Sequence, residues 1–331
     1  MRIVFMGSPA FAVPALERLV ADGHALPLVV TQPDRAAGRG QALRPPAVKT
    51  AALAHGLAVA QPESLAHPEA LAAVAAAGPE AVVVVAFGQF VPRGLRELPP
   101  LGCLNVHASL LPRYRGAAPI ARAIMAGETE TGVSLMRVDA RMDAGPVLLQ
   151  RRCPIGAEDT AGSLTERLAG LGADALAEGL RLLADGRAVW IPQDEAQATH
   201  APKIGDEDCR LALQGGAAAI VNRVRALAPA PGAYLRLPDG RRLKVLRAAA
   251  RAAAAPAGRV VEVGADSLVV GTGEGSLVLL EVQPEGKRRM SGAEFARGLR
   301  LQPGDVLANA GCGPSTPLGT PSPSRGMRHA E

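Results

Sequence analysis

Short apolar runs alternate with helix-like periodic stretches over the first two thirds of the chain. The strand-like segments are residues 2–6, 26–31, 57–60, 81–87, 103–109 and 131–138. The stretches with apolar positions spaced along one helix face are residues 11–19, 48–55, 68–77 and 163–184. The run at 81–87 is continuously apolar, as is typical of a parallel strand buried on both faces. This alternation predicts an α/β fold with a doubly wound, mostly parallel Rossmann-like sheet.

The pattern changes after a polar, irregular segment at residues 191–203. A helix is predicted at 217–227 and another at 291–300. Between them, turn residues separate short β-like segments at 232–237, 242–248, 258–263, 267–272 and 276–283. Five such strands predict a small OB-like β-barrel.

Four segments of the chain follow from these two patterns. They are a catalytic domain at residues 1–190, a linker at 191–204, an OB-like domain at 205–308 and a tail at 309–331. The tail is rich in Gly, Pro and Ser and has almost no apolar periodicity, so disorder is expected there.

Composition narrows the class of protein. The chain has 331 residues, 48% hydrophobic and 20% charged, which suits two globular domains. The first predicted strand ends in Gly7-Ser8-Pro9 rather than Gly-x-Gly-x-x-Gly, which argues against a nicotinamide enzyme. We expect no signal peptide and no membrane span, because the apolar runs are too short. The four cysteines lack metal-ligand spacing, so we expect a protein of the reducing cytoplasm without a metal site.

Charge is distributed unevenly along the chain. Residues 1–203 hold 19 basic and 19 acidic side chains, whereas residues 204–310 hold 15 basic and 11 acidic ones. A basic second half indicates an anionic partner. A solvated surface with a modest excess of arginine would give the same numbers.

An amide and an imidazole stand two residues apart at Asn105 and His107. In an extended segment these side chains point to the same face, so both can reach one substrate atom. An amide donor stabilises a developing oxyanion, and histidine can move a proton near neutral pH. A turn downstream presents Asp143, which could hydrogen-bond His107 and fix its tautomer. Asp139 is the competing carboxylate.

Residues near this pair offer surfaces for a flat ligand. Ser109, Leu110, Leu111 and Pro112 supply a hydroxyl, two apolar side chains and a rigid turn, which could form a pocket wall or simply pack in the core. The loop at residues 87–92 follows a strand end, where open α/β sheets bind ligands, and is a second candidate.

A long loop at residues 32–46 carries Arg35, Arg39 and Arg44 between Gly and Pro residues. Guanidinium groups on such an arm suit contacts with phosphates and bases. A surface loop whose charges only aid solubility would have the same composition.

Several of these segments together resemble a known superfamily. Residues 105–116 read Asn-Val-His-Ala-Ser-Leu-Leu-Pro-Arg-Tyr-Arg-Gly and are followed by Met-Asp-Ala-Gly at 142–145, which resembles the folate-dependent formyltransferases. Residues 4–9, residues 31–40 and the Ala-Pro-Lys at 201–203 are similar to the methionyl-tRNA formyltransferase family. The resemblance covers about residues 1–308.

The resemblance implies transfer of a formyl group from 10-formyltetrahydrofolate to the amine of methionine on initiator methionyl-tRNA. It implies that Asn105 and His107, supported by Asp143, stabilise the tetrahedral oxyanion, and that residues 109–112 contact the folate. It also implies that the arginine loop, chiefly Arg39, grips the tRNA acceptor end. We expect a monomer that uses no metal and forms no covalent intermediate.

Two departures from the family pattern concern packing rather than chemistry. Residues 227–233 read Leu-Ala-Pro-Ala-Pro-Gly-Ala and lack the aromatic residue and the Asn usual there, and His200 stands where relatives usually carry Tyr. The alternative function is a folate-dependent formyltransferase or hydrolase acting on a small-molecule amine or nucleotide sugar. An inactive α/β scaffold that only binds tRNA is a third possibility, which the intact Asn105, His107 and Asp143 set disfavours.

Overall fold

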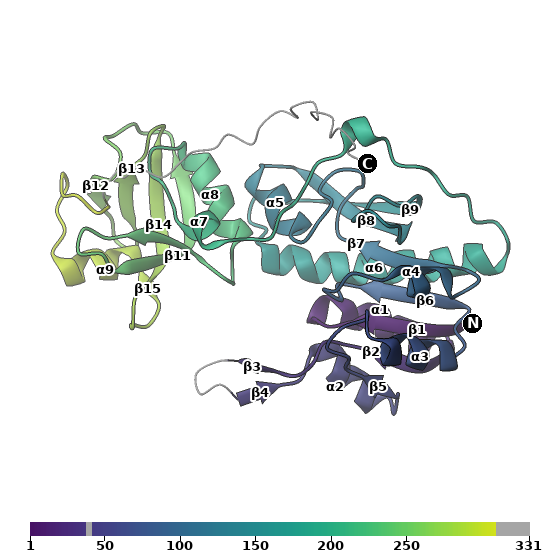
Figure 1. Ribbon diagram of the computed structural model, residues 1–331. Helices are drawn as coiled ribbons and strands as arrows, with labels where there is room; N and C mark the ends of the chain where they lie inside the picture. Colours follow the sequence, from purple (N-terminus) through teal and green to yellow (C-terminus); the bar gives the residue numbers. More distant parts are fainter. Residues whose placement is uncertain (38–41, 309–331) are drawn as a thin grey trace, which may run out of the picture. The chain divides into compact units, whose positions relative to one another are not determined.

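The computed structural model describes residues 1–37 and 42–308 and divides into two compact units (Figure 1). The first unit comprises Met1–Cys209 and Val221–Ala233, and the second comprises Arg210–Ile220 and the chain from Tyr234 onward. The predicted disordered tail and Arg39 lie outside the described residues.

A seven-stranded sheet in the order β5-β2-β1-β6-β7-β8-β9 forms the centre of the first unit. Its strands are β1 (Arg2–Gly7), β2 (Ala25–Val30), β5 (Val59–Ala60), β6 (Ala81–Val85), β7 (Cys103–His107), β8 (Glu130–Arg137) and β9 (Val147–Pro154). The first five strands in this order are mutually parallel, whereas β8 pairs antiparallel with both of its neighbours, β7 and β9. The predicted mostly parallel sheet is confirmed, but β9 was not predicted.

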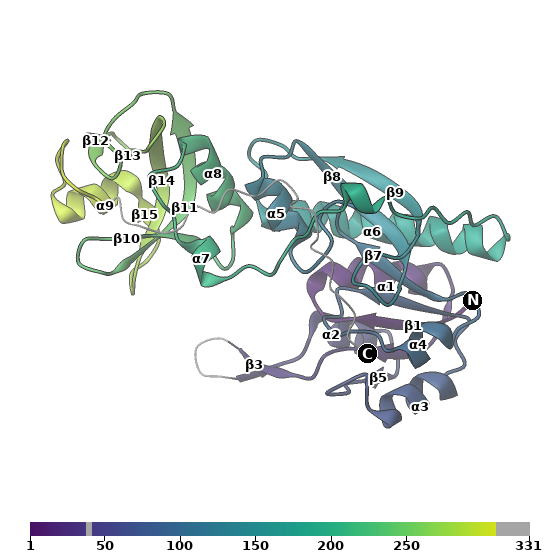
Figure 2. The same cartoon turned by 45° about the horizontal axis from the view of Figure 1, so that its top comes forward.

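Helices cover both faces of this sheet, as Figures 1 and 2 show. Alternate residues of β1 point to opposite layers. Ile3 and Phe5 join the core that α1 (Val13–Ala21), α2 (Ala47–Ala54) and α6 (Ala161–Ala184) share. Val4 and Met6 join the core under α3 (Pro68–Ala76) and α4 (Arg93–Glu97). This two-sided burial explains why the strands read as unbroken apolar runs.

The remaining elements of the first unit are short, and one of them, a helix, is divided between the two units. They are η1 (Ala10–Ala12), β3 (Arg35–Ala37), β4 (Ala42–Arg44), α5 (Pro119–Met125), η2 (Glu195–Gln197), α7 (Asp206–Cys209) and part of α8 (Ala217–Ala226). The long helix α6 begins with a reciprocal capping box, in which Thr160 and Ser163 each satisfy the other's backbone N–H.

An antiparallel sheet in the order β10-β11-β14-β13-β12 forms the second unit, and β15 pairs with β14. The elements are β10 (Ala233–Arg236), β11 (Arg242–Arg251), β12 (Val260–Val263), β13 (Leu268–Gly271), β14 (Ser276–Pro284), β15 (Met290–Ser291) and α9 (Gly292–Leu299). All five strands predicted from the turn signals are present, so the second, antiparallel part of the predicted fold is confirmed.

The described cysteines lie in the interior of the protein. Cys103, Cys153 and Cys209 are buried, and burial raises the pKa of Cys103 to about 12. Cys103 is therefore a small core residue and not a nucleophile.

Among residues 1–37 and 42–308, no helix combines the length and apolarity that crossing a membrane requires.

Candidate functional site

Strand β7 carries the predicted pair Asn105 and His107 between β6 and β8. His107 is only 6% exposed, and Asn105 is half-buried. The Asn105 amide donates to Asp143 Oδ1 at 3.4 Å, and His107 Nδ1 lies 3.7 Å from Asp143 Oδ2. The structure therefore brings together all three residues that the sequence singled out, although Asp143 lies 36 positions beyond His107 in the chain.

A backbone carbonyl, and not Asp143, fixes the tautomer of His107. The His107 Nε2 atom lies 2.9 Å from the carbonyl oxygen of Tyr114, and a carbonyl can only accept a hydrogen bond. The proton therefore sits on Nε2, and Nδ1 faces Asp143. The 3.7 Å distance to Asp143 is too long for a hydrogen bond but suits an ion pair when the ring is protonated. In the structure the Tyr114 carbonyl thus takes the tautomer role expected of Asp143, and Asp143 lies beside Nδ1 as the expected neighbouring charge.

The Asp143 loop is held in an unusual backbone conformation. Asp143 has φ 50, in the left-handed region that side chains other than glycine seldom adopt. Its Oδ2 accepts the N–H of Gly116 at 2.9 Å, and its backbone carbonyl accepts from Gln193 at 2.8 Å. Two residues on, a Cβ on Gly145 would lie 1.9 Å from the Arg137 carbonyl oxygen, so only glycine fits.

The competing carboxylate, Asp139, faces a different partner. Its side chain lies 3.8 Å from Arg96 and accepts the backbone N–H of Ala140. Asp143 is therefore the carboxylate that reaches His107.

The segment Ser109–Pro112 is tied into the sheet. Ser109 is fully buried and its hydroxyl donates to the Arg113 carbonyl at 2.6 Å. The buried Ser134 hydroxyl donates to the Ser109 carbonyl at 2.7 Å and accepts the Leu111 N–H at 3.0 Å. Leu111 packs in a small core cluster, whereas Leu110 and Pro112 stay half-buried. This turn is therefore packed on one side and accessible on the other.

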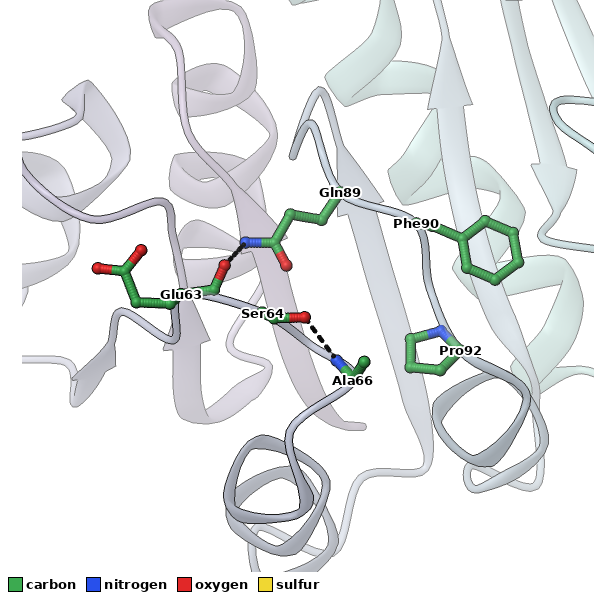
Figure 3. Close-up of a pocket in the computed structure, with 6 residues that line it drawn as sticks. All are labelled: Glu63, Ser64, Ala66, Gln89, Phe90 and Pro92. Carbon is green, nitrogen blue, oxygen red and sulfur yellow. Dashed lines mark hydrogen bonds between the residues drawn. The ribbon is translucent and has the colours of Figure 1, made fainter.

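A hollow of about 340 Å³ lies beside the second candidate loop, residues 87–92 (Figure 3). It is lined by Glu63, Ser64, Ala66, Gln89, Phe90 and Pro92. Figure 3 shows the Gln89 amide reaching the backbone of Glu63, where Nε2 donates at 3.2 Å. The Phe90 ring is 64% exposed and has the Arg96 guanidinium 5.8 Å from its centroid. An exposed ring at the end of parallel strands offers a stacking surface for a flat heterocycle.

The arginine loop has more regular structure than the sequence predicts. Strands β3 and β4 pair antiparallel, which places Arg35 opposite Arg44. Each strand has three residues, too few to show an alternating pattern, so the hairpin could not be read from the sequence. Both arginines are exposed, and Arg35 donates to Gln32 at 3.2 Å.

Asp34 anchors the base of this hairpin. It accepts from Lys49 at 2.7 Å and from Gln61 at 2.7 Å. The hydrogen bond from Lys49, followed by that from Gln61, holds the pKa of Asp34 below its ordinary value. The hairpin thus emerges from a fixed polar cluster.

Two side chains near the site escaped sequence reasoning. Arg115 is 4% exposed and forms a two-pronged ion pair with Glu195, at 3.1 and 3.0 Å. Gln193 lies in the segment predicted to be a linker, yet it bonds to the Asp143 loop. The Arg-Gly at 115–116 was a usable signal, but nothing local marks Gln193. In the described part of the chain, no group of three or more His, Cys, Asp or Glu side chains could hold a metal ion.

Comparisons with known proteins identify relatives of this chain. A family model described as formyl transferase matches residues 1–180, and one described as formyl transferase, C-terminal domain, matches residues 203–300. The methionyl-tRNA formyltransferase of Moorella thermoacetica is 48% identical over 309 residues, covering 93% of this chain and 99% of the relative. That of Methylococcus capsulatus is 50% identical over 297 residues, covering 89% of this chain and 96% of the relative.

Solved structures show the same fold at lower identity. HypX from Aquifex aeolicus in complex with tetrahydrofolic acid superposes with a TM-score of 0.62 at 18% identity. The match covers 89% of this chain but 47% of HypX, so this chain spans about half the length of that protein. An N-formyltransferase from Helicobacter canadensis, solved with folinic acid and dTDP-3-aminofucose, gives a TM-score of 0.63 at 16% identity over 86% of this chain and 100% of that one.

Proposed function

Since this chain belongs to the methionyl-tRNA formyltransferase family, we propose that Asn105, His107 and Asp143 carry out formyl transfer to methionyl-tRNA. The formyl donor is 10-formyltetrahydrofolate, and the acceptor is the free amine of methionine on initiator tRNA. The product, formylmethionyl-tRNA, serves translation initiation. The observation that carries the residue assignment is the convergence of an amide, an imidazole and a carboxylate within 3.7 Å.

The chemistry follows from this arrangement. The amine attacks the formyl carbon, and its carbonyl oxygen becomes an oxyanion. The Asn105 amide and a protonated His107 Nδ1 are the donors that stabilise this oxyanion. The carbon–nitrogen bond to the folate then breaks, the folate nitrogen gains a proton, and the attacking nitrogen loses one. Asp143 lies 3.7 Å from His107 Nδ1, where it forms an ion pair with the imidazole while the ring carries the extra proton.

The substrates need surfaces beyond this centre. For the folate we propose the turn formed by Ser109, Leu110, Leu111 and Pro112, with the accessible Leu110 and Pro112 in contact, and the loop at residues 87–92 as a second wall. For the tRNA we propose Arg35, Arg39 and Arg44. The reaction requires no metal in this scheme, because a deprotonated amine is already a nucleophile. Its substrates place it in the cytoplasm.

Replacing Asn105 or His107 by Ala tests this proposal. Turnover with 10-formyltetrahydrofolate and charged initiator tRNA should fall by roughly a hundredfold or more, the scale of losing one oxyanion donor. Circular dichroism and melting temperature report whether the fold survives. His67→Ala is the matched control, because His67 is exposed at the start of α3. Near-wild-type turnover in both site variants would refute the assignment.

The same assay separates the alternative substrate. A nucleotide-sugar amine offered at equal concentration should receive no formyl group above background. Faster formylation of the sugar than of charged initiator tRNA would replace methionyl-tRNA by a small molecule in the proposal, while keeping the catalytic residues.

A further inference from the structure

The side-chain amide of Gln193, in the segment at residues 191–203, hydrogen-bonds the backbone of the loop that carries Asp143 and the side chain of Arg115. Gln193 Nε2 donates to the Asp143 carbonyl at 2.8 Å and to the Gly145 carbonyl at 2.7 Å. Its Oε1 accepts from Arg115 Nε at 3.0 Å. Both N–H groups and the oxygen are therefore satisfied by three different residues, as expected of a side chain that fixes a loop.

The Arg115 guanidinium determines which end of the Gln193 amide carries the oxygen and which the nitrogen. Arg115 is almost fully buried, and Glu195 holds the two terminal nitrogens of its guanidinium. The remaining Nε–H can only donate, so the oxygen of Gln193 must face it. The amide nitrogen then has to face the two carbonyls of the Asp143 loop. A Glu at this position would place an oxygen against those carbonyls.

The loop that Gln193 holds requires support. Asp143 has a left-handed backbone, which is unfavourable for a residue with a Cβ and persists only where the surroundings impose it. Gly116 holds the side chain of Asp143 at 2.9 Å, and Gln193 holds its backbone. Gly116 directly follows Arg115, which bonds Gln193. The contacts that hold the side chain and the backbone of Asp143 therefore belong to one connected network.

We propose that Gln193 is a positioning residue, which keeps the Asp143 carboxylate beside His107 during formyl transfer. This inference rests on the proposed function of Asp143. It assigns a role in the catalytic step to a segment that the sequence presents only as a connection between domains.

The test compares Gln193→Leu, which removes every hydrogen bond of the amide, with Gln193→Glu, which keeps its size. The matched control is Gln197→Leu, an exposed glutamine that bonds only Asp194 among the described contacts. In formyl transfer to charged initiator tRNA, both Gln193 variants should lose roughly tenfold in kcat, because small displacements of catalytic groups are costly. The KM for folate should change less than about twofold. The control should keep wild-type kinetics.

Two readouts separate positioning from a general loss of structure. The pH–rate profile should change in Gln193→Leu in the same direction as in Asp143→Ala. In an Asp143→Ala background, Gln193→Leu should cost less than about twofold, because residues that act through one another are not additive. An equal loss in both backgrounds, or an unmoved pH profile, overturns the inference.

The outcome also distinguishes this inference from the proposed function. Full activity of Asp143→Ala alone would remove the role of Asp143 and with it the proposed chemistry. A strong loss in Asp143→Ala with wild-type kinetics in both Gln193 variants would leave the chemistry intact and reject Gln193. If Gln193→Leu melts early, Gln193→Glu carries the same comparison.

Discussion

At the scale of single residues, backbone groups do as much as side chains to prepare the site. The Tyr114 carbonyl sets the proton of His107, and the Gly116 N–H holds Asp143. Tyr114 itself has φ 60, and its hydroxyl donates to Glu128 at 2.7 Å. Burial, and then this bond to Glu128, raises the pKa of the Tyr114 phenol, which therefore stays a donor.

Asp143→Asn isolates the charge of the carboxylate. The amide keeps one oxygen for the Gly116 N–H but removes the negative charge that lies 3.7 Å from His107. Turnover should fall roughly a hundredfold, the lower end of what proton transfer by a positioned side chain contributes. Because the charge beside the imidazole is lost, the pH–rate profile of the variant should differ from that of the wild type. Asp139→Asn, in an exposed carboxylate that faces Arg96, is the control and should keep the wild-type profile.

The sequence predicted the members of the site better than their contacts. Asn105 and His107 are readable because two-residue spacing on a strand fixes their common face. The tautomer of the ring depends on a backbone carbonyl seven residues away, and the distance from His107 to Asp143 and the role of Gln193 arise from contacts between positions 36 to 50 residues apart along the chain. No local pattern encodes such contacts.

At the scale of elements, prediction succeeded where burial alone defines the strand. Strand β6 is buried at every position and was evident as an apolar run. Strand β9 was missed because its segment reads Val-Leu-Leu-Gln-Arg-Arg-Cys-Pro, and three consecutive polar residues hide the alternation of less and more exposed positions that the folded strand shows from Leu149 to Pro154. It pairs antiparallel with β8 at the edge of the sheet, where only one neighbour is present.

The hairpin β3–β4 offers a pH-dependent test at its base. Asp34→Asn removes the bond to Lys49, so the free energy of unfolding should decrease at pH 7. The pKa of Asp34 is lowered in the folded state, so its stabilising contribution is full above the unfolded value, about 3.9. That contribution is lost as pH falls through the folded value. Urea unfolding of variant and wild type should therefore differ equally at pH 7 and pH 5, and the two curves should converge only as pH falls below about 3.9 and through the lower folded pKa.

A difference that shrank already between pH 7 and pH 5 would assign the effect to another group. Lys49→Met should reproduce the loss at pH 7, and combining it with Asp34→Asn should add little, because both changes break the same pair.

At the scale of the whole molecule, the distribution of charge matters for the tRNA. The chain carries 36 basic and 31 acidic side chains, and the excess lies mostly after residue 203. If phosphate contacts dominate, the affinity for initiator tRNA should fall steeply with salt. Replacing Arg35 or Arg44 by Gln should reduce the slope of log affinity against log salt by about one each. Arg93→Gln, in an exposed arginine on α4, is the control and should leave the slope unchanged.

The path of the chain also determines where the protein can be cut. Val221–Ala233 belongs to the first unit although residues 210–220 before it do not. Within that unit Arg225 donates to the Gly156 carbonyl at 2.8 Å, Ala226 is part of a buried core, and Ala228 accepts the N–H of Gly162 at 3.1 Å.

A stop codon after residue 204 would therefore strip core contacts from the catalytic half and yield an aggregating fragment. Modular exchange between relatives has the same constraint. A chimaera joined near residue 204 builds the core of the first unit from two different parents. A junction near residue 233 takes the whole first unit from one parent, but residues 210–220 of the second unit then come from that parent as well. The two units of this enzyme thus cannot be separated by a single cut at the point where the sequence looks most like a linker.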